Sequence, residues 1–312
     1  MKFILRKNHW LIFILGGLIS CNSPKNETSK VANTSLTQID SAPFLLPKIP
    51  VSMMLFGQKI DLTDVDIRER LDRELIANAY SQSSTILYFK RANRYFPQIE
   101  KTLKKNNLPT DLKYLAVIES GLSQAVSSAG AKGFWQFMPE TGKEFGLQLN
   151  DYVDERLHLE KSTAAACHYL KIAKDSLNDW FLAIAAYNRG MGGVRSDIRW
   201  QQTDDYFDTH LNSETSRYVF RLMAIKLIME QPTEYGFDLQ SIELYEPMAT
   251  KKVIIENGLE DVALWAKEIG ANYKIIKLLN PWILKNSLPS TQIFEIEIPE
   301  NTMNLKPRSA YN

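Results

Sequence analysis

Apolar residues recur three or four positions apart along the middle of the chain, a spacing typical of amphipathic helices. This pattern predicts that residues 61–231 are nearly all helical. The expected helices cover 64–79, 83–106, 109–120, 161–176, 179–189 and 213–230. Pro97 is expected to kink or divide the second of them, and Ser213 is a candidate cap for the last.

The pattern changes after Pro232. The β-branched run "KKVIIE" at 251–256 precedes two short helical stretches, and "IFEIEIP" at 293–299 alternates as a strand does. A βααβ order of this kind indicates a small separate domain. The expected fold class is therefore mainly α, with a small C-terminal βααβ domain.

The N-terminus carries a basic segment followed by a short apolar run. Lys2, Arg6 and Lys7 precede the apolar residues 10–19, which is typical of a secretory signal and too short for a comfortable membrane span. "LISC" resembles the bacterial lipobox, which implies cleavage before Cys21 and lipidation of Cys21. An ordinary cleaved signal and an uncleaved anchor remain alternatives. The polar residues that follow are expected to form a flexible tether over 21–60.

Composition narrows the class of function. The net charge of +1 gives no basic surface for nucleic acid, so no nucleic-acid partner is expected. The scattered histidines lack the spacing of a zinc helix, so neither a metal nor another cofactor is expected. Cys167 has no partner if Cys21 carries lipid, and it is expected to be a small buried residue.

The stretch "LKYLAVIESGL" places one carboxylate among apolar residues. Leu112, Leu115 and Ala116 lie seven, four and three positions before Glu119, on the same stripe of a helix. A carboxylate on a buried face is costly to ionise, so its pKa tends to rise. Either a partner neutralises Glu119, or its tendency to hold a proton has a use.

Three blocks then resemble the soluble-lytic-transglycosylase-like family, which is goose-lysozyme-like in fold. They are "IESGLSQ", "SSAGAKGFWQFMPETG" and "AAYNRGMGGV", and together they cover roughly residues 97–230. The family cleaves the β-1,4 bond between N-acetylmuramic acid and N-acetylglucosamine in peptidoglycan, forming 1,6-anhydro ends. The resemblance implies that Glu119 is the single catalytic acid/base.

The resemblance also assigns substrate-binding positions. It implies Ser127 near the N-acetyl group, with Ser128 as a fallback, and Tyr187 near the catalytic carboxyl. The remaining implied contacts are Gln136, Met138, Asn188 (which could instead support its helix end) and Glu214. The implied partner is the glycan strand, and protein partners are not indicated.

No Asp or Glu lies between Glu119 and Glu140. Most glycosidases need two carboxylates, so this gap favours attack by the sugar's own 6-hydroxyl over attack by water. A hydrolytic muramidase remains the rival enzyme, and a catalytically idle glycan-binding lipoprotein the rival of another class.

The expected organisation is a signal peptide at 1–20, the tether at 21–60, an N-terminal helical region at 61–108, the lysozyme-like domain at 109–232, a C-terminal domain at 233–300 and a tail at 301–312. The C-terminal domain weakly resembles a LysM module, which implies either glycan binding or a degenerate packing role. A lipidated Cys21 followed by Asn22 indicates the periplasmic face of the outer membrane.

Overall fold

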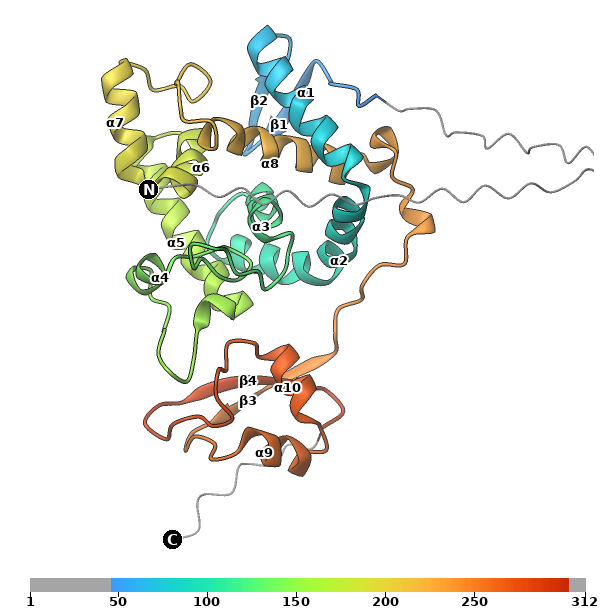
Figure 1. Cartoon of the computed structure of the whole chain (residues 1–312), viewed down its shortest axis with the longest axis vertical. Coiled ribbons are helices and arrows are strands. Elements are labelled where there is room, and N and C mark those ends of the chain that lie inside the picture. Colours follow the sequence, from blue (N-terminus) through green and yellow to red (C-terminus); the bar gives the residue numbers. More distant parts are fainter. Residues whose placement is uncertain (1–45, 303–312) are drawn as a thin grey trace, which may run out of the picture. The chain divides into compact units, whose positions relative to one another are not determined.

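The computed structural model describes residues 46–302, so Cys21 and the expected signal lie outside the described residues. Helices dominate (Figure 1). They are α1 (Val65–Tyr80), α2 (Gln82–Lys105), α3 (Lys113–Ser120), α4 (Pro139–Glu144), α5 (Leu159–Leu177), α6 (Trp180–Arg189), α7 (Met191–Gln201), α8 (Thr215–Glu230), α9 (Val262–Glu268) and α10 (Tyr273–Leu279). The strands are β1 (Ser52–Leu55), β2 (Gln58–Asp61), β3 (Thr250–Ile255) and β4 (Phe294–Pro299). The predicted fold class is confirmed.

The expected tether is too long, because β1 and β2 form a hairpin within it. Phe56 and Gly57 make the turn with φ of 52° and 77°, the left-handed conformation that two-residue hairpin turns require. The Phe56 ring is buried 5.7 Å from the ring of Trp180 and 5.9 Å from that of Phe181. Its backbone N–H donates to Asp111 at 2.8 Å. The hairpin therefore belongs to the folded core.

The first two helices follow the pattern closely. Asp64 caps α1 by accepting from the Ile67 N–H at 3.0 Å. Pro97 lies inside α2 without dividing it, so the second of the two expected effects, a division of the helix, does not occur. Contacts of α2 with α1, α3 and α5 hold it together although proline removes one backbone hydrogen bond.

Helix α8 is the central element of the helical region. It packs against α1, α3 and α6, and most of its residues are buried, as expected for a helix apolar on all sides. Lys226, a buried cation of α8, pairs with Asp111 at 2.8 Å and Glu230 at 2.6 Å. Asn212, not Ser213, supports the start of α8, because its side chain accepts from the Thr215 N–H at 2.9 Å.

Helix α7 was not expected. The glycines in "RGMGG" disfavour a helix in the sequence pattern, yet α7 begins directly after Gly190. The positive φ of Gly190, 82°, changes the direction of the chain between α6 and α7. Val194 is the buried residue of α7. Cys167 on α5 is buried as predicted. Within residues 46–302 no helix combines the length and apolarity needed to cross a membrane.

The C-terminal domain has the predicted βααβ order. β3 and β4 pair antiparallel from Thr250 opposite Pro299 to Ile255 opposite Phe294. The buried Asn280 side chain accepts from the Glu297 N–H at 2.9 Å and so fixes β4 behind α10. Val153 contributes to the apolar core of this domain.

Candidate active site

Glu119 lies in the last turn of α3. Leu112, Leu115 and Ala116 are fully buried as the stripe predicted, and Glu119 itself is partly buried. The helix ends at Gly121 with φ of 59°, and the Gly121 N–H donates back to the Val117 carbonyl at 2.8 Å. This position holds the carboxyl at the edge of the core, where it keeps some access to the surface.

The environment of Glu119 favours the protonated acid. Burial raises its pKa to about 7, and the negative charge of Glu214 acts in the same direction. The hydrogen bond from Tyr218 and the charge of Arg221 oppose the rise. At neutral pH the group is therefore poised between acid and carboxylate, as a group that both gives and takes a proton must be.

Tyr218 is the direct hydrogen-bond partner of Glu119. Its hydroxyl donates to Glu119 Oε1 across the contact between α8 and α3. Burial raises the pKa of Tyr218 well above its usual value, so the group stays a neutral phenol that can donate. Sequence reasoning missed this residue. A signal was present, because a tyrosine inside an apolar helix needs a partner for its hydroxyl.

Tyr187 was expected near the Glu119 carboxyl, but its hydroxyl donates its hydrogen bond to another group. Its hydroxyl donates to the Trp135 carbonyl at 2.8 Å. Burial and, to a smaller degree, the charge of Glu119 raise the pKa of Tyr187, so the two groups lie in the same electrostatic neighbourhood. In this structure Tyr187 holds the loop beside Glu119, and Tyr218 holds Glu119 itself.

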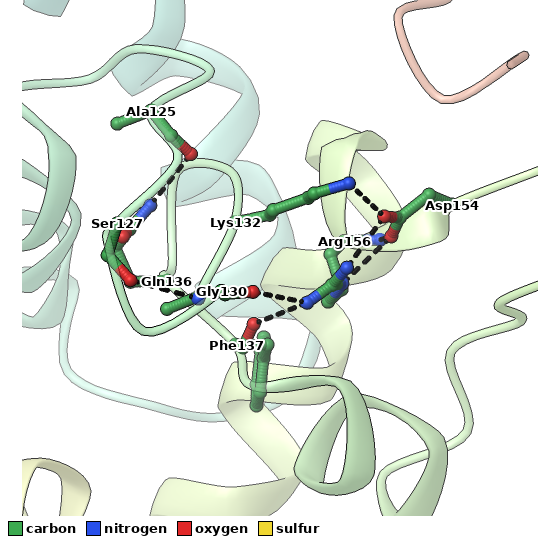
Figure 2. Close-up of polar contacts among 9 residues, drawn as sticks. Ala125, Ser127, Gly130, Lys132, Gln136, Phe137, Asp154 and Arg156 are labelled. Carbon is green, nitrogen blue, oxygen red and sulfur yellow. Dashed lines mark hydrogen bonds and ion pairs between the residues drawn. The ribbon is translucent and has the colours of Figure 1, made fainter.

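Residues 125–138 form a tight loop, here called the motif loop (Figure 2). Gln136 adopts a left-handed φ of 48°. Its Nε2 donates to the carbonyls of Ala125 at 3.0 Å and Gly133 at 2.8 Å. These bonds offset the cost of about 1–2 kcal/mol for a non-glycine residue in that region. The other polar atom of this side chain, Gln136 Oε1, accepts no hydrogen bond from the described residues.

Ser127 and Met138 lie at opposite ends of the motif loop. Ser127 Oγ accepts from the Ala131 N–H at 2.9 Å, which closes a turn (Figure 2). Met138 directly precedes α4, and 38% of its surface is exposed. An exposed thioether at this point is available for contact with a ligand. The neighbouring Trp135 is fully buried and donates from Nε1 to Thr163 Oγ1 at 2.9 Å.

Asn188 and Glu214 meet where α6 approaches the start of α8. Asn188 Nδ2 donates to Glu214 Oε1 at 3.3 Å, and Thr215 Oγ1 donates to Asn188 Oδ1 at 2.7 Å. Asn188 therefore connects the end of α6 to the start of α8. This agrees with the second of its two expected roles, support of its helix end. Glu214 is exposed yet close enough for its charge to act on Glu119.

The arrangement suits proton transfer. Within residues 46–302, no three or more His, Cys, Asp or Glu side chains are grouped so that they could hold a metal ion. One carboxyl with a pKa near neutrality, a phenol bonded to it and a second carboxylate nearby are the ingredients of general acid/base catalysis.

Comparison with known proteins agrees with these features. Residues 96–209 match the transglycosylase SLT domain, and residues 251–302 match the soluble lytic transglycosylase C-terminal LysM-like domain. Membrane-bound lytic murein transglycosylase D of Escherichia coli K12 is 29% identical over 240 residues, which are 75% of this chain and 52% of that protein. The chain thus spans about half the length of this relative.

A second relative and two solved structures cover less of the chain. A putative tributyltin chloride resistance protein of Alteromonas sp. M-1 is 35% identical over 117 residues, 37% of this chain and 56% of that protein. Lytic transglycosylase Slt of Pseudomonas aeruginosa matches 48% of this chain and 26% of its own at 23% identity, with a TM-score of 0.35. The 70 kDa soluble lytic transglycosylase of Escherichia coli matches 45% and 24% at 23% identity, with a TM-score of 0.37.

The two domain matches fall on the parts of the chain where the sequence blocks and the βααβ order had placed them. Glu119, Tyr187 and the motif loop all lie inside the first match. The chain therefore carries a transglycosylase SLT domain followed by a LysM-like domain, and it is homologous to the membrane-bound lytic murein transglycosylase D of Escherichia coli.

Proposed function

We propose that this protein is a peptidoglycan lytic transglycosylase with Glu119 as its single acid/base. The substrate bond is the β-1,4 link from N-acetylmuramic acid to N-acetylglucosamine, and the product carries a 1,6-anhydro ring. The observation that carries the proposal is a partly buried carboxyl with a pKa of about 7 inside the SLT domain.

Two proton transfers complete the reaction. Protonated Glu119 gives its proton to the glycosidic oxygen as the bond from the muramoyl C1 breaks. The resulting carboxylate then takes the proton of the 6-hydroxyl as that oxygen bonds to C1. Glu119 ends as the acid, and no water is consumed.

Tyr218 supports both halves of this cycle. Its hydrogen bond stabilises the carboxylate that forms in the first transfer, since hydrogen bonds to a charged group are stronger than those to a neutral one. Burial acts in the opposite direction and keeps the resting acid protonated. The balance between them sets a pKa that serves both steps.

The sugar-binding positions are proposed from the polar groups and exposed surface that each residue leaves free. Gln136 offers Oε1, and Ser127 offers a hydroxyl proton that no hydrogen bond within the described residues uses. Met138 offers exposed surface, and Glu214 an exposed carboxylate. Asn188 and Tyr187 act through their bonds to Glu214 and the motif loop.

One observation favours a second candidate, a hydrolytic muramidase. No carboxylate lies between Glu119 and Glu140 in the sequence, but Glu214, the residue before α8, is near enough to raise the pKa of Glu119. A second carboxylate could activate water. The two reactions differ by one water in the product mass, so mass spectrometry of digested peptidoglycan separates them. A Glu214→Gln variant that still forms anhydro ends supports the transglycosylase, whereas loss of a reducing-end product in that variant supports the hydrolase.

The location is proposed from the N-terminal sequence. Lipidation at Cys21 would hold the enzyme at the periplasmic face of the outer membrane, next to its glycan substrate. The name of the Escherichia coli relative, a membrane-bound murein transglycosylase, supports membrane attachment.

A further inference from the structure

Arg156 is a buried cation that the proposed chemistry does not use. Only 5% of its side chain is exposed. Nε and Nη2 bind the two oxygens of Asp154 at 2.9 and 2.7 Å, and Nη1 donates to the carbonyls of Gly130 at 2.9 Å and Phe137 at 3.2 Å (Figure 2). A buried guanidinium is costly unless its donors are matched in this way.

Asp154 is equally committed to this cluster. Burial alone would raise its pKa, but the hydrogen bonds and charges of Arg156 and Lys132 hold that pKa below its usual range. Lys132 Nζ lies 3.2 Å from Asp154 Oδ2 and belongs to the motif loop (Figure 2). The carboxylate therefore stays charged at neutral pH and fixes the plane of the guanidinium.

The contacts of Arg156 span the motif loop. Gly130 lies in the first turn of the loop and Phe137 near the end of the loop. Arg156 Nη1 donates to the carbonyls of both and so joins the two parts (Figure 2). The loop also presses on the backbone of Arg156, since a Cβ added at Gly133, where φ is 80°, would lie 2.1 Å from the Arg156 carbonyl oxygen. Only glycine fits there.

The opposite side of the motif loop is bound to the elements around Glu119. Ser120 Oγ, next to Glu119, donates to the Phe134 carbonyl at 2.9 Å. Tyr187 donates to the Trp135 carbonyl at 2.8 Å. A shift of the loop on the Arg156 side would therefore move Gln136 and the groups that border Glu119.

We propose that Arg156, oriented by Asp154, is a positioning residue that holds the motif loop in the shape that binds glycan beside Glu119. The glycan part rests on the proposed function. Replacing a buried ion pair by apolar residues often changes stability little, so such a pair is better explained by the geometry it imposes. Lysine cannot replace this arginine, because an ammonium lacks the planar fork that reaches a carboxylate and two carbonyls together.

The first test reads the loop in the free protein by hydrogen exchange. The Gly133 N–H donates to the Ala125 carbonyl at 2.9 Å and the Lys132 N–H to that of Phe137 at 3.1 Å. In Arg156→Met these amides should exchange roughly tenfold faster or more, since two bonds to a charged donor are lost. Exchange at the wild-type rate would overturn the proposal, whatever the enzymatic activity.

A matched control separates positioning from general stability. Lys226→Met also breaks a buried ion pair, with Asp111 and Glu230, about two helical turns beyond Tyr218 on α8. It should lower Tm without changing exchange in the motif loop. Arg156→Lys should retain only part of the wild-type protection of these amides against exchange. Asp154→Asn should speed their exchange about as much as Arg156→Met does.

The second test reads glycan binding without turnover. In a Glu119→Gln background, adding Arg156→Met should weaken the affinity for a purified GlcNAc–MurNAc tetrasaccharide by roughly tenfold, while adding Lys226→Met should not. In the active enzyme Arg156→Met should raise KM and leave the pH dependence of kcat unchanged. Unchanged affinity and KM, or no binding by Glu119→Gln itself, would contradict the glycan role. Failure of the proposed function would instead show as an inactive wild-type enzyme in which Arg156→Met still loosens the loop.

Discussion

At the scale of single residues, Glu119 combines burial with a hydrogen bond that favours its ionised form. The first raises its pKa and the second limits the rise, which gives a value of about 7. Sequence reasoning could find Glu119, because an acid on an apolar stripe within the IESGLSQ block is visible in the chain itself. It could not find Tyr218, because that contact depends on how α8 lies against α3.

The proposed acid role of Glu119 predicts a decline in rate as pH rises through about 7, since the first step needs the protonated form. In Tyr218→Phe the hydrogen bond that lowers this pKa is lost, so the alkaline limb of the pH–rate profile should move to higher pH. Tyr187→Phe removes a bond to the motif loop instead and should move the limb less. Equal profiles for wild type and Tyr218→Phe would contradict the assigned hydrogen bond.

The same pKa predicts a pH-dependent stability effect. The pKa of Glu119 is about 7 in the folded state against an ordinary 4.5, so the folded state holds more protons between these values and loses stability as pH rises from 4.5 to 7. Glu119→Gln cannot ionise. Its Tm should exceed that of wild type by a few degrees at pH 8 and match it near pH 4.5. A large fall in Tm at pH 8 would show that the carboxylate stabilises the fold.

At the scale of elements, the periodic helices were predictable, whereas the hairpin of β1 and β2 and the glycine-marked helix α7 were not. α1, α2, α5 and α8 follow the apolar spacing within a few residues. The hairpin was missed because its turn uses Phe56 and Gly57 instead of the usual Asn-Gly, and its strands have only four residues each. What fixes it is contact with α6, which is distant in sequence.

Phe56→Ala tests whether the hairpin belongs to the folded core. Removing a buried ring that packs on Trp180 and Phe181 should cost about 3–5 kcal/mol of unfolding free energy, measured by denaturant titration. Met54→Ala is the matched control on the same hairpin, because Met54 is 53% exposed, and it should cost little. Equal stability of the two variants would mean that residues 51–62 do not contribute to the core.

At the scale of the whole molecule, an SLT domain and a LysM-like domain share one chain whose N-terminal sequence indicates a lipid anchor. Both domains could be predicted from sequence, since each has a local pattern. The link between them could not. Val153 lies in the helical half of the sequence yet packs in the C-terminal core, and the Asp154 N–H donates to the Trp282 carbonyl at 2.9 Å.

The proposed anchor predicts that the full chain fractionates with membranes. Cys21→Ser removes the only sulfur that signal processing could lipidate and should release the protein into the soluble periplasmic fraction or leave its signal uncleaved. Cys167→Ser is the control, because this buried thiol lies in α5. Membrane association of Cys21→Ser with a cleaved signal would contradict a lipid at this position.

The central claim is that Glu119 drives cleavage without water. Mass spectrometry of fragments released from purified sacculi by the wild-type enzyme tests it most directly, with Glu119→Gln as the blank. We predict disaccharide fragments with 1,6-anhydro-N-acetylmuramic acid ends from wild type and none from Glu119→Gln. Fragments with reducing ends and no anhydro form, or equal release by the variant, would contradict the account.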